Sequence, residues 1–156
     1  ALADLVAREH GHIHQSMGFG ADAVWRLLQR CDAWRRPERF AEVLQACTCD
    51  ARGRLGLAEQ AYPQAQRLQR ALEAGLAIDQ AALSAQALAE GLKGPQVGAR
   101  IQAAQIDAIA QALVRAHQRG VRVRVLMDAK SATANAYVLD LLKQEKSVYS
   151  SKIFAA

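Results

Sequence analysis

The pentapeptide Asp50-Ala51-Arg52-Gly53-Arg54 separates two segments with different patterns. Residues 40–47 before it have apolar side chains at helical spacing, which predicts a helix. Tyr62-Pro63 after it is typical of the entry to another helix, because proline suits the first helical turn. We therefore expect the pentapeptide at a helix-to-loop boundary, where Gly53 permits a turn.

This boundary gathers one carboxylate and two guanidinium groups. Arginine presents a planar fork of donors that fits carboxylates and phosphates, so Arg52 and Arg54 are candidates to hold an anion. Alternatively, Asp50 pairs with one of these arginines and only closes the loop.

Length and composition favour one mainly helical domain. The chain has 156 residues, enough for a real core. It is rich in Ala, Leu, Gln, Arg and Glu, which favour helices, so we expect a bundle of about six. The net charge of +5 and the pI near 9.4 favour an anionic partner such as nucleic acid.

The three cysteines, Cys31, Cys47 and Cys49, indicate a reducing compartment, and we expect a cytoplasmic protein with buried thiols and no cofactor. No stretch approaches the ~18 apolar residues of a membrane span, so no membrane partner is expected. The sequence opens at Ala1 inside an apparent helix and without Met. This start favours a fragment, a processed chain or an engineered protein.

Histidines alternate at positions 10, 12 and 14. Histidine is the commonest metal ligand, and His10 and His14 share one face if the first helix continues through them. Nothing nearby in the sequence completes a metal site. The two are therefore weak metal candidates, and a structural or surface role is favoured.

The next segments carry most of the positive charge. Residues 21–34 have a helical apolar face, and Pro37 suits the first turn of the helix that follows. Their basic side chains are expected to form either one RNA-binding rim or a solvated surface. The residues concerned are Arg26, Arg30, Arg35, Arg36 and Arg39.

Two further helices and a glycine-rich turn follow. Pro63 begins a helix, and Asp79 is expected to cap a second one that runs through Leu88. The stretch 91–98 combines glycines and Lys93 with a helix that restarts at Pro95. Free backbone N–H groups beside a cation predict a phosphate seat there, although many helix–helix turns have this composition.

Five motifs occur in one order, at residues 9–14, 32–39, 50–54, 62–64 and 91–95. Together they resemble the C-terminal part of bacterial multifunctional CCA-adding tRNA nucleotidyltransferases over about residues 1–113. The resemblance implies that residues 25–70 belong to a part that supports tRNA. It also implies that nucleotide addition is carried by an N-terminal head that these residues do not contain.

The same resemblance bears on the histidines. His10 and His14 match the His-x-x-x-His that follows the HD pair in that family, and the pair itself would lie before Ala1. We therefore expect a catalytically incomplete tRNA-binding fragment and not an enzyme. Its RNA-binding residues would be the five arginines above together with Arg52, Arg54 and Lys93.

Residues 106–145 resemble instead a helix–strand unit of the phospholipase D superfamily, with an alternating strand at 121–127. The His-x-Lys-x(4)-Asp motif of that superfamily does not occur in the chain. Two joined families suggest a fused or artificial chimera without a physiological ligand, which is the alternative hypothesis. The expected units are residues 1–105, 106–146 and a β-leaning tail, 147–156.

The predicted strand at 121–127 needs a pairing partner, because unpaired backbone groups are costly when buried. The tail at 147–154 is one candidate, and the same strand of a second molecule is the other. We expect a homodimer closed through this strand.

Overall fold

The computed structural model describes residues 1–118, and helices are the only regular elements of this part, which contains no strand. The elements in chain order are α1 (Leu2–Gln15), η1 (Ser16–Gly18, a 3₁₀ helix), α2 (Ala21–Arg30), α3 (Pro37–Arg52), α4 (Pro63–Leu76), α5 (Gln80–Ala89) and α6 (Gly94–Gln118). The expectation of a mainly α fold is confirmed for the described part.

Several expectations concern residues 119–156 and lie outside the described part of the chain. They are the strand at 121–127, the helix expected after it and the β-leaning tail at 147–156. The homodimer through residues 121–127 therefore stays a prediction.

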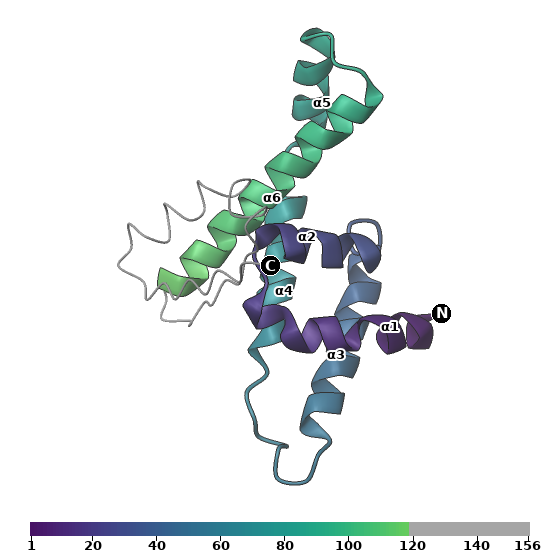
Figure 1. Ribbon diagram of the computed structural model, residues 1–156, viewed down its shortest axis with the longest axis vertical. Coiled ribbons are helices and arrows are strands. Elements are labelled where there is room, and N and C mark those ends of the chain that lie inside the picture. The colour runs from purple at the N-terminus through teal and green to yellow at the C-terminus, as the bar shows by residue number, and fades with distance from the viewer. Residues whose placement is uncertain (119–156) are drawn as a thin grey trace, which may run out of the picture.

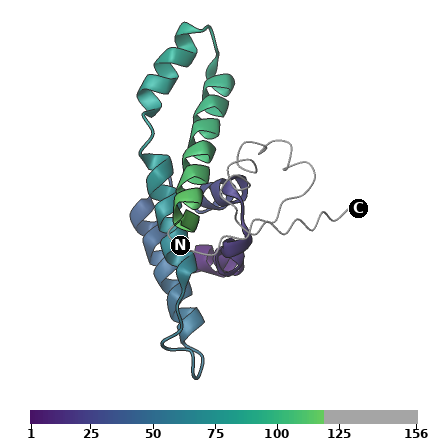
Figure 2. The ribbon, with the colours of Figure 1, turned by 90° about the vertical axis from the view of Figure 1, so that its left-hand side faces the viewer.

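The helices pack around one core. Helix α4 lies beside α6, α1 packs on α3, and α2 packs on α6 (Figure 1). In a view turned by 90°, helices α1 and α2 lie to one side of α3 and α4 (Figure 2). The core is built from apolar residues of five helices, α1, α2, α3, α4 and α6, and includes Leu5, Ile13, Val24, Leu27, Leu28, Phe40, Val43, Leu68, Leu72, Ile109 and Ala110.

Helix α2 ends earlier than the sequence predicted. The expected helix covered residues 21–34, but α2 stops at Arg30 because Asp32 adopts a positive φ of 54°. The Asp32 N–H donates to the Gln29 carbonyl and the Ala33 N–H to the Leu28 carbonyl, both at 3.0 Å. This pair of bonds is the Schellman ending, in which glycine is the usual left-handed residue and aspartate is rarer.

The pentapeptide at 50–54 contains the predicted helix-to-loop boundary, because α3 ends at Arg52 and Gly53 is its C-cap residue. Helix α3 continues to Arg52, so Asp50 lies in its last turn and not in a loop. Gly53 has φ −70°, and the left-handed residue of the turn is Gly56, with φ 82°. Gly53 is useful for another reason: an added Cβ would lie 3.0 Å from the Cys49 carbonyl oxygen.

Helix α5 is capped as predicted but is less buried than expected. The Asp79 carboxylate accepts a hydrogen bond from the Ala82 N–H at 2.9 Å. Leu88, through which the helix was expected to run, is 61% exposed, and Ala87 is the buried residue of the helix. The reason is that α5 packs on the first half of α6 and projects with it away from the core (Figure 1).

Two glycines provide a matched stability test. A Cβ at Gly75 would lie 2.6 Å from the Trp34 ring, whereas one at Gly98 of α6 meets nothing within 4 Å. We expect Gly75→Ala to lower the free energy of unfolding by about 1–3 kcal/mol through overpacking. Gly98→Ala should raise it by about 0.5–1 kcal/mol, because alanine favours helix. Urea denaturation of both variants measures this, and a stabilised Gly75→Ala would contradict the packing of Trp34 on Gly75.

Candidate nucleic-acid interface

The first turns of α4 hold the end of α1 in place. Arg67 is 7% exposed, and its two terminal nitrogens donate to the carbonyl oxygens of Ser16 and Phe19. Burial lowers the pKa of the Arg67 guanidinium to about 10. Gln64, one turn earlier, donates from Nε2 to the His14 carbonyl at 3.1 Å. Together these bonds hold the backbone from His14 to Phe19 against α4, and so they position the His14 side chain.

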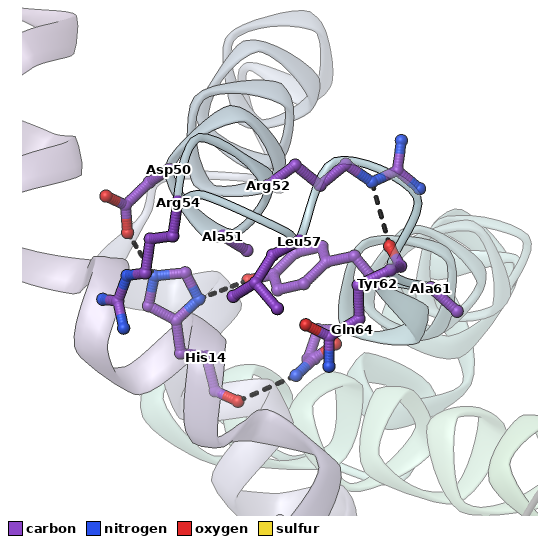
Figure 3. A pocket seen from close by; sticks show the side chains of 10 residues that line it. His14, Asp50, Ala51, Arg52, Arg54, Leu57, Ala61, Tyr62 and Gln64 are labelled. Atoms are coloured by element: carbon purple, nitrogen blue, oxygen red, sulfur yellow. Dashed lines mark hydrogen bonds and ion pairs between the residues drawn. The ribbon is translucent and has the colours of Figure 1, made fainter.

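His14 joins three segments of the chain. Its Nε2 lies 3.0 Å from an Asp50 carboxylate oxygen, and its Nδ1 lies 2.8 Å from the Tyr62 hydroxyl (Figure 3). With the imidazole neutral and its proton on Nε2, His14 donates to Asp50 and accepts from Tyr62. Burial, reinforced by Cys47 and Asp50, raises the pKa of Tyr62 to about 12. Tyr62 therefore keeps its proton and stays a donor at neutral pH.

The weak metal candidates, His10 and His14, do lie together, as the continued helix α1 predicts. Their ring centroids are 5.9 Å apart in an edge-to-face arrangement. His10 turns its Nδ1 toward the Val6 and Ala7 carbonyls, and both ring nitrogens of His14 are already bonded. Within residues 1–118, no group of three or more His, Cys, Asp or Glu side chains is arranged to hold a metal. The pair remains a candidate by residue type only.

A pocket of about 340 Å³ opens beside His14. Its lining comes from α1, the end of α3, the loop after it and the start of α4: His14, Asp50, Ala51, Arg52, Arg54, Leu57, Gln60, Ala61, Tyr62 and Gln64. Both arginines of the opening pentapeptide thus line one pocket.

The two arginines do not converge on a single anion. Figure 3 shows their guanidinium groups at opposite sides of the pocket, with the Tyr62 ring and Leu57 between them. Arg52 donates from Nε to the Gln60 carbonyl at 3.1 Å, and Arg54 makes no side-chain hydrogen bond or ion pair within residues 1–118. Asp50 is bonded to His14 and to neither arginine, so the loop-closing pair is not formed.

Three other predicted arginines gather around one acid, Asp32. Guanidinium nitrogens of Arg35, Arg36 and Arg39 lie 3.8, 3.5 and 3.5 Å from its carboxylate oxygens. Arg39 also donates to the Cys31 carbonyl at 3.2 Å. Three cations around one anion leave an excess of positive charge at the start of α3. We call these four residues the Asp32 cluster.

The remaining two arginines of the expected rim are neutralised. Arg26 pairs with Asp22 at 2.6 Å, and Arg30 pairs with the buried carboxylate of Glu9 at 3.0 Å. Among the seven predicted arginines, the unneutralised charge therefore lies in two groups, the Asp32 cluster and the pocket, and not along one rim. They lie at opposite ends of α3, whose 16 residues span about 22 Å at 1.5 Å per residue.

The predicted phosphate seat at Lys93 is largely filled by the protein itself. The Gln96 side chain accepts from the Lys93 N–H at 2.9 Å, and the Gln96 N–H donates to the Lys93 carbonyl at 2.8 Å. Pro95 has no N–H to offer. Lys93 is exposed, so its contribution would be a point charge without a ring of backbone donors.

The fold and site define a helical protein with two exposed cationic groups, and comparison with known proteins gives it relatives. The chain is 60% identical over 111 residues to the multifunctional CCA protein of Verminephrobacter eiseniae, covering 71% of this chain and 27% of that protein. The multifunctional CCA proteins of Leptothrix cholodnii and Cupriavidus metallidurans are 59% and 52% identical, over 70% and 75% of this chain. The chain spans about a quarter of the length of these relatives.

The similarity to CCA proteins is therefore confirmed over about 70% of the chain. The phospholipase D resemblance and the chimera find no support in the comparisons. No family model matches the chain, and no solved structure does. Among the helices of residues 1–118, none has the length and apolar character needed to cross a bilayer.

The burial of the Tyr62 hydroxyl, which raises its pKa, predicts a pH effect on stability. In the unfolded chain Tyr62 ionises near its ordinary pKa of 10.0, whereas the folded protein holds the proton to about pH 12. The unfolded state therefore loses its proton first, and this contribution to stability falls as pH rises from 10 to 12. Tyr62→Phe should cost about 1 kcal/mol at pH 7 through the lost hydrogen bond.

Because phenylalanine does not titrate, the stability gap between the two proteins should shrink between pH 10 and 12. Urea denaturation of both proteins at pH 7, 10 and 11 measures the gap. A gap that stays constant with pH would show that the Tyr62 hydroxyl is not held as described.

Proposed function

We propose that residues 1–118 form an RNA-binding helical module that supports tRNA, as part of a protein of the CCA type. The observation that carries the proposal is the Asp32 cluster, in which three guanidiniums surround one carboxylate. The similarity to multifunctional CCA proteins supports it, and so does the net charge of +5.

The Asp32 cluster suits a phosphate backbone for physical reasons. Asp32 restrains three long side chains that would otherwise lose rotamer entropy on binding. Arg35 and Arg36 are 77% and 56% exposed, so their remaining N–H groups reach solvent. Such exposed guanidiniums displace the counterions of a nucleic acid and bind it without reading its sequence.

The pocket at the other end of α3 supplies a second point of attachment. Because α3 is one continuous helix, its two ends, each beside one of the cationic groups, lie about 22 Å apart. A folded RNA whose backbone passes both points would be bound more tightly than a short flexible strand.

The first test uses charge changes of opposite sign in the Asp32 cluster. Asp32→Asn removes the negative charge, and asparagine tolerates the positive φ. We expect tRNA affinity to rise about fivefold at low salt, from about 1 kcal/mol per unit charge at 4 Å in water. Arg35→Ala/Arg36→Ala should weaken binding and reduce the salt slope by about 2.

Filter binding or electrophoretic shift with tRNA at several salt concentrations measures both effects. Arg8→Ala is the matched control, since Arg8 is an equally exposed arginine paired with an acid, Asp4, on α1. If Asp32→Asn loses stability while its tRNA affinity stays unchanged, the cluster is only a structural feature of the turn and the proposal fails.

The second test concerns catalysis. Because the family resemblance assigns nucleotide addition to a head outside these residues, we expect the 156-residue chain alone to add no nucleotide to a tRNA that lacks its terminal residues. Nickel- or magnesium-dependent hydrolysis of cyclic phosphodiesters should also be undetectable. Radiolabelled nucleotide incorporation and chromatographic detection of the ring-opened phosphomonoester are the measurements. A hydrolytic activity that disappears in His10→Ala would contradict this expectation.

A further inference from the structure

We propose that the pocket beside His14 takes one unpaired nucleotide of a single-stranded RNA stretch, with the flanking phosphates on Arg52 and Arg54. The inference rests on the proposed function, because it supposes that RNA lies on this protein. It assigns to the pocket a ligand class and a recognition mode that the Asp32 cluster does not have.

The placement of the two guanidiniums is the first argument. They lie on opposite sides of the pocket, separated by Tyr62 and Leu57 (Figure 3). A single phosphate cannot contact both sides, whereas a polynucleotide carries a phosphate before and after every nucleotide. Within residues 1–118, Arg54 makes no side-chain hydrogen bond or ion pair, and Arg52 uses only its Nε, on the Gln60 carbonyl. The fork of each guanidinium is therefore available.

The size and walls of the pocket are the second argument. Its volume of about 340 Å³ lies at the small end of the ~300–1,000 Å³ range of ligand sites. Between the two cations lie the half-buried Tyr62 ring and the Leu57 side chain, which form an apolar surface. A base that is not paired can lie against an aromatic ring and gain stacking energy. A base inside a duplex cannot enter such a pocket.

The third argument is an acceptor without a donor. Gln64 Oε1 is buried and has no hydrogen-bond partner, while Nε2 of the same amide is committed to the His14 carbonyl. That carbonyl needs a donor, so the amide cannot turn round. Because this oxygen is shielded from solvent, a ligand N–H or O–H would pair with it only after a shift of the Gln64 side chain, which lines the pocket.

These groups together select the ligand class. Asp50 and Gln64 offer acceptors, and the arginines offer cationic donors. A simple anion would gain the arginines but would face the Asp50 carboxylate. A ribonucleotide within a chain has phosphates for the arginines, and its base amino or ribose hydroxyl groups are donors for the acceptors.

Fluorescence anisotropy with a labelled single-stranded RNA, and with the same strand annealed to its complement, tests the proposal. The test variant is Arg52→Ala/Arg54→Ala, and the matched control is Arg70→Ala, an exposed arginine of α4 outside the pocket. We expect the double variant to bind the single strand about tenfold more weakly, with a salt slope reduced by about 1.4 for two phosphates. Its loss for the duplex should match that of Arg70→Ala.

Both test arginines are exposed, so the melting temperature should stay nearly unchanged. If the double variant melts early, Arg54→Ala alone gives the same test with about a threefold loss, since it breaks no side-chain bond within residues 1–118. A second readout locates the base: single-stranded RNA containing 5-iodouridine should photocrosslink to the peptide that contains Tyr62.

Three results would overturn the inference: equal losses for single strand and duplex, a double variant that behaves like Arg70→Ala, or crosslinks confined to other peptides. If tRNA binding still responds to Arg35→Ala/Arg36→Ala in any of these cases, the proposed function stands without the pocket. If the unaltered protein binds neither tRNA nor single-stranded RNA, both proposals fail together.

Discussion

The arrangement of the candidate interface depends on one buried guanidinium. Arg67 donates to the Ser16 carbonyl, which also accepts the last 3₁₀ bond from the Phe19 N–H, and to the Phe19 carbonyl just after η1. No carboxylate within residues 1–118 pairs with it, and its lowered pKa records the cost of burying the charge. The cost is offset because an apolar residue at this position would leave the Phe19 carbonyl without this donor and would remove the second donor of the buried Ser16 carbonyl. Arg67 therefore ties the turn between α1 and α2 to α4.

The pocket follows from this attachment. Tyr62, Gln64 and Arg67 all belong to the start of α4, and each bonds to the segment from His14 to Phe19. The walls contributed by α1 and α4 are thus tied together at several points. The two pocket arginines are less firmly held than these walls. Arg52 is the last residue of α3, and Arg54 lies in an exposed loop in which Leu55 is fully exposed. Firm walls and adjustable cations are a suitable combination for a ligand with a flat base and flexible phosphates.

The helices could be predicted from the sequence because their signals are local. Pro37 and Pro63 begin α3 and α4, and the Asp79 carboxylate caps α5, all as expected. The partners of the charged residues could not be predicted, because they are distant in sequence. His14 meets Asp50 across 36 residues, and Arg30 meets Glu9 across 21. Composition showed an excess of arginine but not which arginines are neutralised.

The predicted helix over residues 21–34 was too long because of Asp32, and the same residue also decides the partners of three arginines. A glycine at that position would have indicated the end of α2, but an aspartate in the left-handed conformation is too rare to be inferred from sequence. The same residue turns the chain into α3 and gathers Arg35, Arg36 and Arg39 around its carboxylate. A backbone constraint thus decides where positive charge accumulates. Because α3 separates this charge from the pocket arginines by the length of one helix, the proposed RNA-binding surface would select its partner by shape before it reads any base.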